Sequence, residues 1–106
     1  MDVKIKINTG EGMNSFKTKK LVGELYSLII SSKEDVDIKI ISDIGYDILD
    51  IMQFNGIEYF PLRIQNKDKK GHGLNYQADS LILNESIIIN VSGIANNDVD
   101  IILRMI

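Results

Sequence analysis

The sequence predicts an α+β fold, in which a largely antiparallel β-sheet packs against one main helix. Residues 3–7 and 36–40 alternate apolar and polar residues, which is the period of a half-buried strand. Residues 15–31 instead repeat large apolar side chains at helical spacing. The 106-residue chain is 44% hydrophobic and has no cysteine, so an ordinary core must hold it together without disulfides. We therefore expect one globular domain, residues 1–106.

The strands are predicted from alternation. Val3, Ile5 and Ile7 alternate with lysines, and the same period returns at residues 36–40. Toward the C-terminus, turn-forming residues separate further apolar runs. The additional expected strands are residues 80–83, 86–91 and 99–106, with a turn at Gly93 to Asn97.

The main helix is expected over residues 15–31. Asn14 or Ser15 supplies an N-cap oxygen, and Ser31-Ser32 ends the pattern. Gly23 costs up to ~1 kcal/mol relative to alanine inside a helix, which indicates close packing on the sheet there. The side chains predicted to be buried against the sheet are Leu21, Leu25, Leu28 and Ile29.

Residues 43–64 allow two interpretations. Asn55-Gly56 is typical of a type I′ hairpin turn, since both residues accept positive φ, and this turn would pair Ile51 with Phe60 and Leu49 with Leu62. The alternative is a second helix over residues 43–54, stopped by Gly56. The hairpin is favoured because Gly45 and the β-branched residues weaken the helix.

The loop Gly10 to Ser15 is the first candidate site. It lies between an expected strand and the expected helix, and Gly10, Gly12 and Ser15 occupy the places of a glycine-rich phosphate-binding pattern. Three observations argue against a phosphate site. The carboxylate of Glu11 would repel an anion, no lysine follows at the spacing of a P-loop, and the chain is too short for a complete dinucleotide-binding fold. A plain connector is therefore the favoured interpretation of this loop.

The second candidate site is the segment from Lys67 to Gly73. Glycines flank the only histidine, His72, and three lysines precede it, Lys67, Lys69 and Lys70. These groups could cradle an anion, with His72 donating a hydrogen bond or titrating. A solvated, exposed loop is the more common role of such a segment.

Composition argues against most enzyme classes. A single histidine excludes sites with two imidazoles, and the absence of cysteine excludes thiolate chemistry. The carboxylate pairs lack a calcium-loop pattern, and no serine lies in a nucleophile elbow. We therefore expect no metal, no cofactor and no catalysis.

The leading functional hypothesis is a small non-catalytic interaction module. Its expected partner is a protein, as for inhibitors, antitoxins, immunity proteins and assembly factors. The alternative is a nucleotide- or nucleic-acid-binding domain that uses one of the two loops above, although the net charge of −3 has the wrong sign for broad attraction to phosphates or anionic membranes.

The N-terminus lacks the apolar segment of a signal peptide, so a cytoplasmic location is expected. The isoleucine-, asparagine- and lysine-rich composition indicates an AT-rich genome, such as that of a low-GC bacterium or phage.

Sheet edges give a further expectation. Pro61 and Arg63 would guard one edge, whereas residues 86–91 and 99–106 carry few guards. If these two segments were edge strands, a homodimer or an added partner strand would cover them. The alternative places both segments in the middle of the sheet, paired with each other and with residues 3–7.

Overall fold

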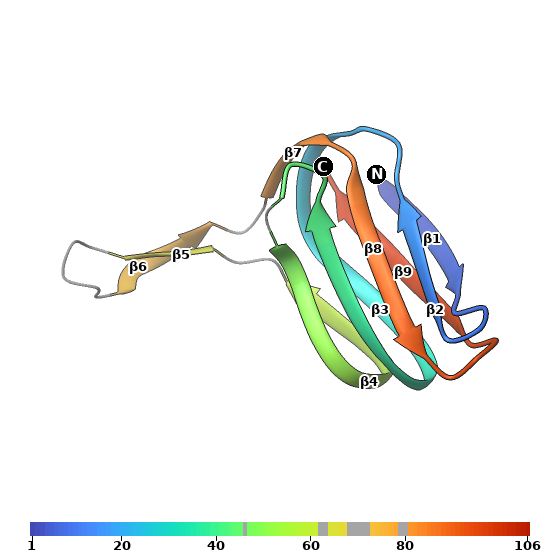
Figure 1. The fold of residues 1–106 in the computed structure, drawn as a ribbon. Coiled ribbons are helices and arrows are strands. Elements are labelled where there is room, and N and C mark those ends of the chain that lie inside the picture. The colour runs from blue at the N-terminus through green and yellow to red at the C-terminus, as the bar shows by residue number, and fades with distance from the viewer. Residues whose placement is uncertain (46, 62–63, 68–72, 79–80) are drawn as a thin grey trace.

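The computed structural model describes residues 1–45, 47–61, 64–67, 73–78 and 81–106, and over these residues the chain is all-β (Figure 1). The predicted α+β class is therefore wrong, because strands occupy the segments expected to be helical. The strands are β1 (Asp2–Asn8), β2 (Met13–Lys17), β3 (Leu21–Ser42), β4 (Asp47–Pro61), β5 (Ile64–Lys67), β6 (Gly73–Ala78), β7 (Leu81–Glu85), β8 (Ile87–Gly93) and β9 (Asp98–Met105).

Seven of these strands form one antiparallel sheet. Its main order is β1-β9-β3-β8-β2, and β4 and β7 both pair with β3. Strands β5 and β6 pair with each other in a separate two-stranded sheet. The 22-residue β3 is thus the backbone of the fold, since four other strands pair with it.

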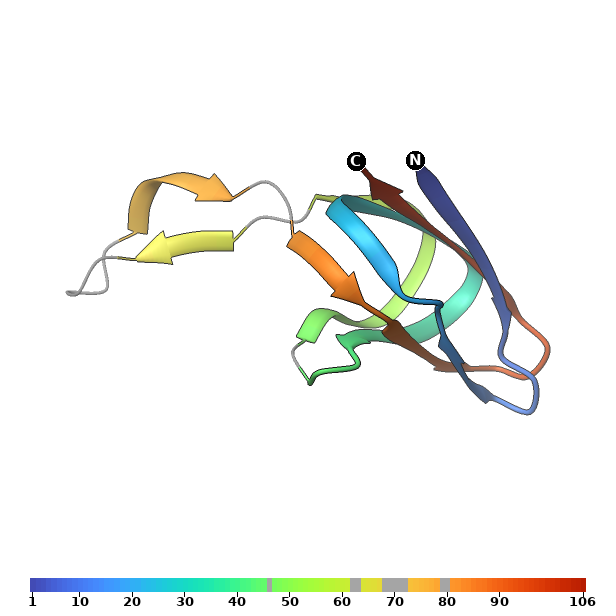
Figure 2. The same ribbon diagram turned by 90° about the horizontal axis from the view of Figure 1, so that it is seen from above.

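The sheet curls because β3 bends at residues 33–35. Before the bend, residues 25–32 pair with β9, and after it, residues 36–42 pair with β8. Strand β4 follows β3 around the corner on its other side. Two halves result, which we call the β1 half (β1, β9, the start of β3 and the end of β4) and the β2 half (β2, β8, the end of β3 and the start of β4). Figures 1 and 2 show β1 and β9 on one side of the fold, with β2 and β8 on the other.

The core lies between the two halves. Alternate side chains from both halves point inward, so each half buries one face and leaves the other in water. The fully buried aliphatic residues come from β3, β8 and β9 above all. They include Leu25, Leu28, Ile30, Ile38, Ile40, Ile87, Ile89, Ile101 and Leu103.

The predicted helix over residues 15–31 is wrong, and a β-bulge explains why. The register with β9 shifts between Leu25 and Ser27, so the strand gains one residue there. The bulge reverses which side chains point inward, so that Leu25 and Leu28 are both buried despite their spacing of three. Such spacing imitates a helical face in the sequence. Four residues of this segment are predicted to be buried. Leu25 and Leu28 are buried in the structure, whereas Leu21 and Ile29 are only half-buried.

Neither interpretation of residues 43–64 is correct. Residues 47–61 form one continuous strand, and Gly56 pairs with Ser32 of β3 instead of turning the chain. Gly56 does have positive φ (91°), but the other positive-φ residue is Gln53 (54°), not Asn55. These residues let β4 turn the corner beside the bend of β3, since three residues of β3 (33–35) lie opposite Asn55 alone.

The strands predicted from alternation at residues 3–7 and 36–40 are confirmed. Those predicted from apolar runs at residues 86–91 and 99–106 are confirmed as β8 and β9, except that positions 86 and 106 lie outside the strands, and the turn after Gly93 is confirmed too. Residues 80–83 correspond to β7, although position 80 lies outside the described residues. The edge expectation for residues 86–91 and 99–106 is wrong: β8 lies between β3 and β2, and β9 lies between β1 and β3. The alternative is confirmed in two respects: β8 and β9 lie inside the sheet, and β9 pairs with β1. It is wrong in a third, because β8 and β9 do not pair with each other but with different parts of β3.

Candidate binding face

The predicted loop from Gly10 to Ser15 does not lead into a helix: residues 10–12 form the turn between β1 and β2, and Ser15 lies within β2. Its amide groups are already used: the Gly10 N–H donates to Asn8 Oδ1 (2.7 Å) and the Gly12 N–H to the Thr9 carbonyl (2.9 Å). The Gly10 and Gly12 carbonyls accept from Asn96 and Gly93, each at 2.8 Å. The loop is therefore tied to the β8–β9 turn, and its glycine amides do not form an open phosphate cradle.

The second predicted segment falls mostly outside the described residues. Lys69, Lys70 and His72 lie there, and only the backbone of Lys67 is described, at the end of β5 in register with Gly73. The proposed anion site at these residues stays a prediction.

A different set of residues meets on the outer face of the β2 half. Ser15 lies directly opposite Asn90, Asn90 opposite Lys39, and Lys39 opposite Asp50. Directly opposite residues of antiparallel strands project from the same face. These four side chains, which we call the polar row, therefore cross β2, β8, β3 and β4 in one line.

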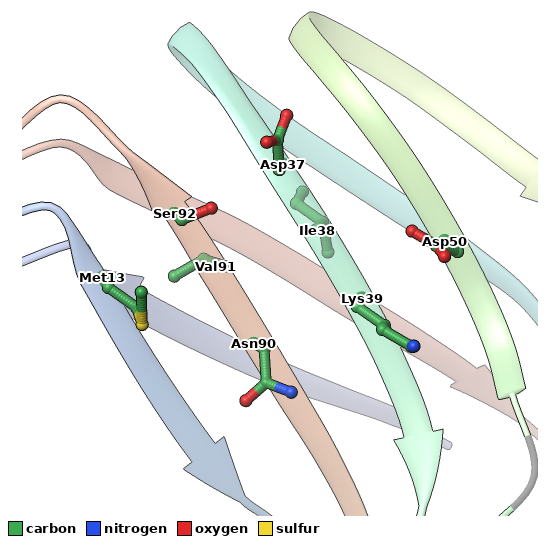
Figure 3. A pocket seen from close by; sticks show the side chains of 8 residues that line it. All are labelled: Met13, Asp37, Ile38, Lys39, Asp50, Asn90, Val91 and Ser92. Carbon is green, nitrogen blue, oxygen red and sulfur yellow. The ribbon is translucent and has the colours of Figure 1, made fainter.

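A shallow hollow of about 140 Å³ lies along this row (Figure 3). Asn90, Lys39 and Asp50 line it together with Ser92 and Asp37 of the neighbouring row. Met13 closes the β2 end with an exposed thioether side chain. Its floor consists of the strands themselves at Ile38 and Val91, whose side chains point into the core.

The side chains around the hollow differ in how firmly they are held. Asp37 Oδ1 accepts a hydrogen bond from the Gln53 N–H (2.9 Å), and Lys39 Nζ lies 4.0 Å from Asp47 Oδ1. Asp50, Asn90 and Ser92 make no side-chain hydrogen bond within the described part of the chain. The hollow thus offers unused donors and acceptors on a rigid sheet, which can hold a polar ligand without rearranging the backbone.

Among the described residues, no group of three histidine, cysteine or acidic side chains is arranged to hold a metal ion. Over the same residues there is no helix with the length and apolar character needed to span a bilayer.

Of the polar row, only Ser15 is among the candidate residues that the sequence predicts, and there as part of a phosphate-binding loop. The members are far apart in the chain, at positions 15, 39, 50 and 90. Alternation shows that Lys39 and Asn90 point away from the core, but only strand order and register reveal that they are neighbours.

No protein-family model and no curated protein matches the sequence. The chain is similar to a solved mutant of the family 29 carbohydrate-binding module CBM29-2, with 12% identity, 95% of this chain and 70% of that chain covered, and a TM-score of 0.42. It is similar to TmCBM61 in complex with beta-1,4-galactotriose (11% identity, 96% and 68% covered, TM-score 0.40). An infectious bursal disease virus structure also matches (8% identity, 98% and 32% covered, TM-score 0.32). These scores are too low to transfer a function, which must be inferred from this chain's own residues.

Proposed function

We propose that the chain is a small non-catalytic binding module, and that its ligand is a hydroxyl-rich chain, a carbohydrate, laid across the polar row. The main support for this proposal is the alignment of Ser15, Asn90, Lys39 and Asp50 across four strands. Within the described residues, the side chains of Asn90 and Asp50 also have unused hydrogen-bonding groups.

The chemistry of the row suits hydroxyl groups. Asp50 only accepts hydrogen bonds, Lys39 only donates them, and Asn90 and Ser15 do both. A sugar hydroxyl also donates and accepts, so each position can pair with one. Adjacent strands are about 4.8 Å apart, so the row extends for about 14 Å, long enough for more than one sugar unit.

The openness of the hollow favours binding over catalysis. Acid–base catalysis depends on a group that a sheltered environment has tuned and oriented. Here Asp50 is exposed and the Lys39 side chain is 47% exposed. These groups suit recognition of a ligand that keeps part of its surface in water.

The same face is poorly suited to the protein partner expected from the sequence. Protein interfaces have an apolar centre and a polar rim, whereas the centre of this face is polar. The negative charges of Asp37 and Asp50 repel the phosphates of a nucleic acid.

The hollow contains no aromatic side chain among its lining residues, so stacking contributes nothing to binding. We therefore expect weak binding of the carbohydrate, with a Kd of about 0.1–1 mM.

A glycan array followed by calorimetry tests this function. The best array ligand should bind the unmodified chain, and Asn90→Ala and Asp50→Ala should each weaken binding about tenfold, since each removes a hydrogen bond. The matched controls are Asn84→Ala and Asp43→Ala, which change exposed residues outside the hollow. Binding to no glycan, or binding that both hollow variants retain, would contradict the proposal.

A further inference from the structure

The outer face of the β1 half carries an apolar row instead of a polar one. Ile102 of β9 lies opposite Ile29 of β3, which lies opposite Tyr59 of β4. Ile29 and Ile102 are half-buried and Tyr59 is 50% exposed, so these three side chains, which we call the apolar row, form a continuous apolar strip. On the same side, Ile57 extends the strip along β4 at 78% exposure. These apolar side chains gather on one outer face of the sheet, which makes the strip a candidate interaction surface.

Charged residues lie on both sides of this row, and their signs are reversed from one side to the other. On one side, Asp2 of β1 lies opposite Arg104 of β9, with Asp2 Oδ1 4.0 Å from Arg104 Nε. On the other side, Lys6 of β1 lies opposite Asp100 of β9, with Lys6 Nζ 3.9 Å from Asp100 Oδ1. From the first side of the row to the second, the charge therefore changes from negative to positive on β1 and from positive to negative on β9.

We propose that this face binds a second copy of the same chain, by face-to-face packing around a two-fold axis that runs along the apolar row. A rotation of 180° about that axis places each charged side of one subunit against the other charged side of its partner. It places Asp2 against Lys6 of the partner subunit, and Arg104 against Asp100 of the partner subunit. Each of these four charges meets the opposite sign, while the apolar row packs on its own counterpart. Lys4, which lies opposite Ile102 at the β1 end of the row, meets the partner's Lys4.

The pattern fits a second copy better than other occupants. A two-fold interface requires a surface that is complementary to itself, and sign reversal across a central row provides that property. The mixed charges do not suit a polyanion or an anionic membrane. Sheets that pack face to face keep their strands within about 30° of each other, which keeps the charged pairs near one another. Lys4, at the edge of the row, can extend its ammonium into water.

Charge reversal tests the orientation directly. Arg104→Glu would place a carboxylate against Asp100 of the partner subunit, and Asp100→Lys would place an ammonium against the partner's Arg104. Each variant alone should dimerise at least tenfold more weakly than the unmodified chain in sedimentation equilibrium. An equimolar mixture should recover dimer, because the new acid and the new base then face each other.

Two further variants separate dimer loss from unfolding. Tyr59→Lys places a charge in the apolar row at a half-exposed position and should abolish the dimer, whereas Met52→Lys, 75% exposed elsewhere on β4, should not. Thermal melts monitor folding throughout. An unmodified chain that stays monomeric at high micromolar concentration, or a mixture of the two reversed variants that recovers no dimer, would overturn the proposal. Glycan binding is measured on the opposite face, so either proposal can fail without the other.

Discussion

Gly93 of β8 packs directly against Asp35 at the bend of β3: a Cβ built on Gly93 would lie 2.7 Å from the Asp35 carbonyl oxygen. A methyl group cannot fit at that distance from backbone. This contact lies at the end of the β3–β8 pairing, where Gly93 is in register with Val36, and the same register aligns Asn90 with Lys39.

Gly93→Ala should therefore destabilise the fold by about 1–3 kcal/mol, since the neighbouring backbone must move. Urea unfolding measures this cost. Gly10→Ala is the control, because a Cβ at Gly10 meets no atom within 4 Å and only its positive φ of 60° opposes the substitution. Gly93 has no positive φ, so a loss below about 0.5 kcal/mol in Gly93→Ala would show that the contact with Asp35 does not constrain this position.

Thr9 joins the β1–β2 loop to the β8–β9 turn. Its buried Oγ1 donates to the Ile94 carbonyl (2.6 Å) and accepts from the Asn97 N–H (2.9 Å). Thr9→Val keeps the shape but leaves both backbone groups without this partner, which should cost about 2–3 kcal/mol. Thr9→Ser retains the hydroxyl and should lose much less. If both variants unfold at the same urea concentration, the hydroxyl does not stabilise the turn.

Leu25 has no exposed surface and lies beside the bulge of β3. Leu25→Ala should cost about 2–5 kcal/mol through lost burial and the cavity left behind. Val22→Ala, at a 70% exposed position of the same strand, should change the free energy of unfolding by less than about 0.5 kcal/mol. A cost below about 1 kcal/mol for Leu25→Ala would mean that the inward face of β3 is assigned incorrectly.

Gly56 allows β4 to turn the corner beside β3. Its φ is 91° and a Cβ there would meet no atom within 4 Å, so Gly56→Val acts through backbone strain alone. We expect a loss of about 1–3 kcal/mol in urea unfolding. Asn55→Gly should cost less, since φ at Asn55 is not positive and only its exposed side-chain hydrogen bond to Asp35 is removed. The opposite ranking would show that the side chain of Asn55, and not the backbone conformation of Gly56, stabilises this corner.

The sequence predicts those strands whose alternation is unbroken. Val36, Ile38 and Ile40 are all buried, as the period of two requires. The bulge near Ser27 breaks the period in the first part of β3, and the result resembles a helix. Strand-type Cα and Cβ chemical shifts across residues 21–31 would confirm the correction, and helical shifts would contradict it.

The binding face could not be predicted for a related reason. Asn90 and Asp50 belong to strands that meet only through β3, and a shift of one residue in either register would turn the side chain toward the core. Local patterns determine which residues point outward. Long-range pairing determines which of them form one surface, and a single sequence does not reveal that pairing.

Amide chemical-shift mapping with the best array glycan tests the central claim, that the polar row is the binding site. We expect shifts concentrated at Ser15, Lys39, Asp50 and Asn90, which saturate together with one Kd. Shifts confined to β1 and β9, or no shift at any glycan concentration up to several times the expected Kd, would contradict it.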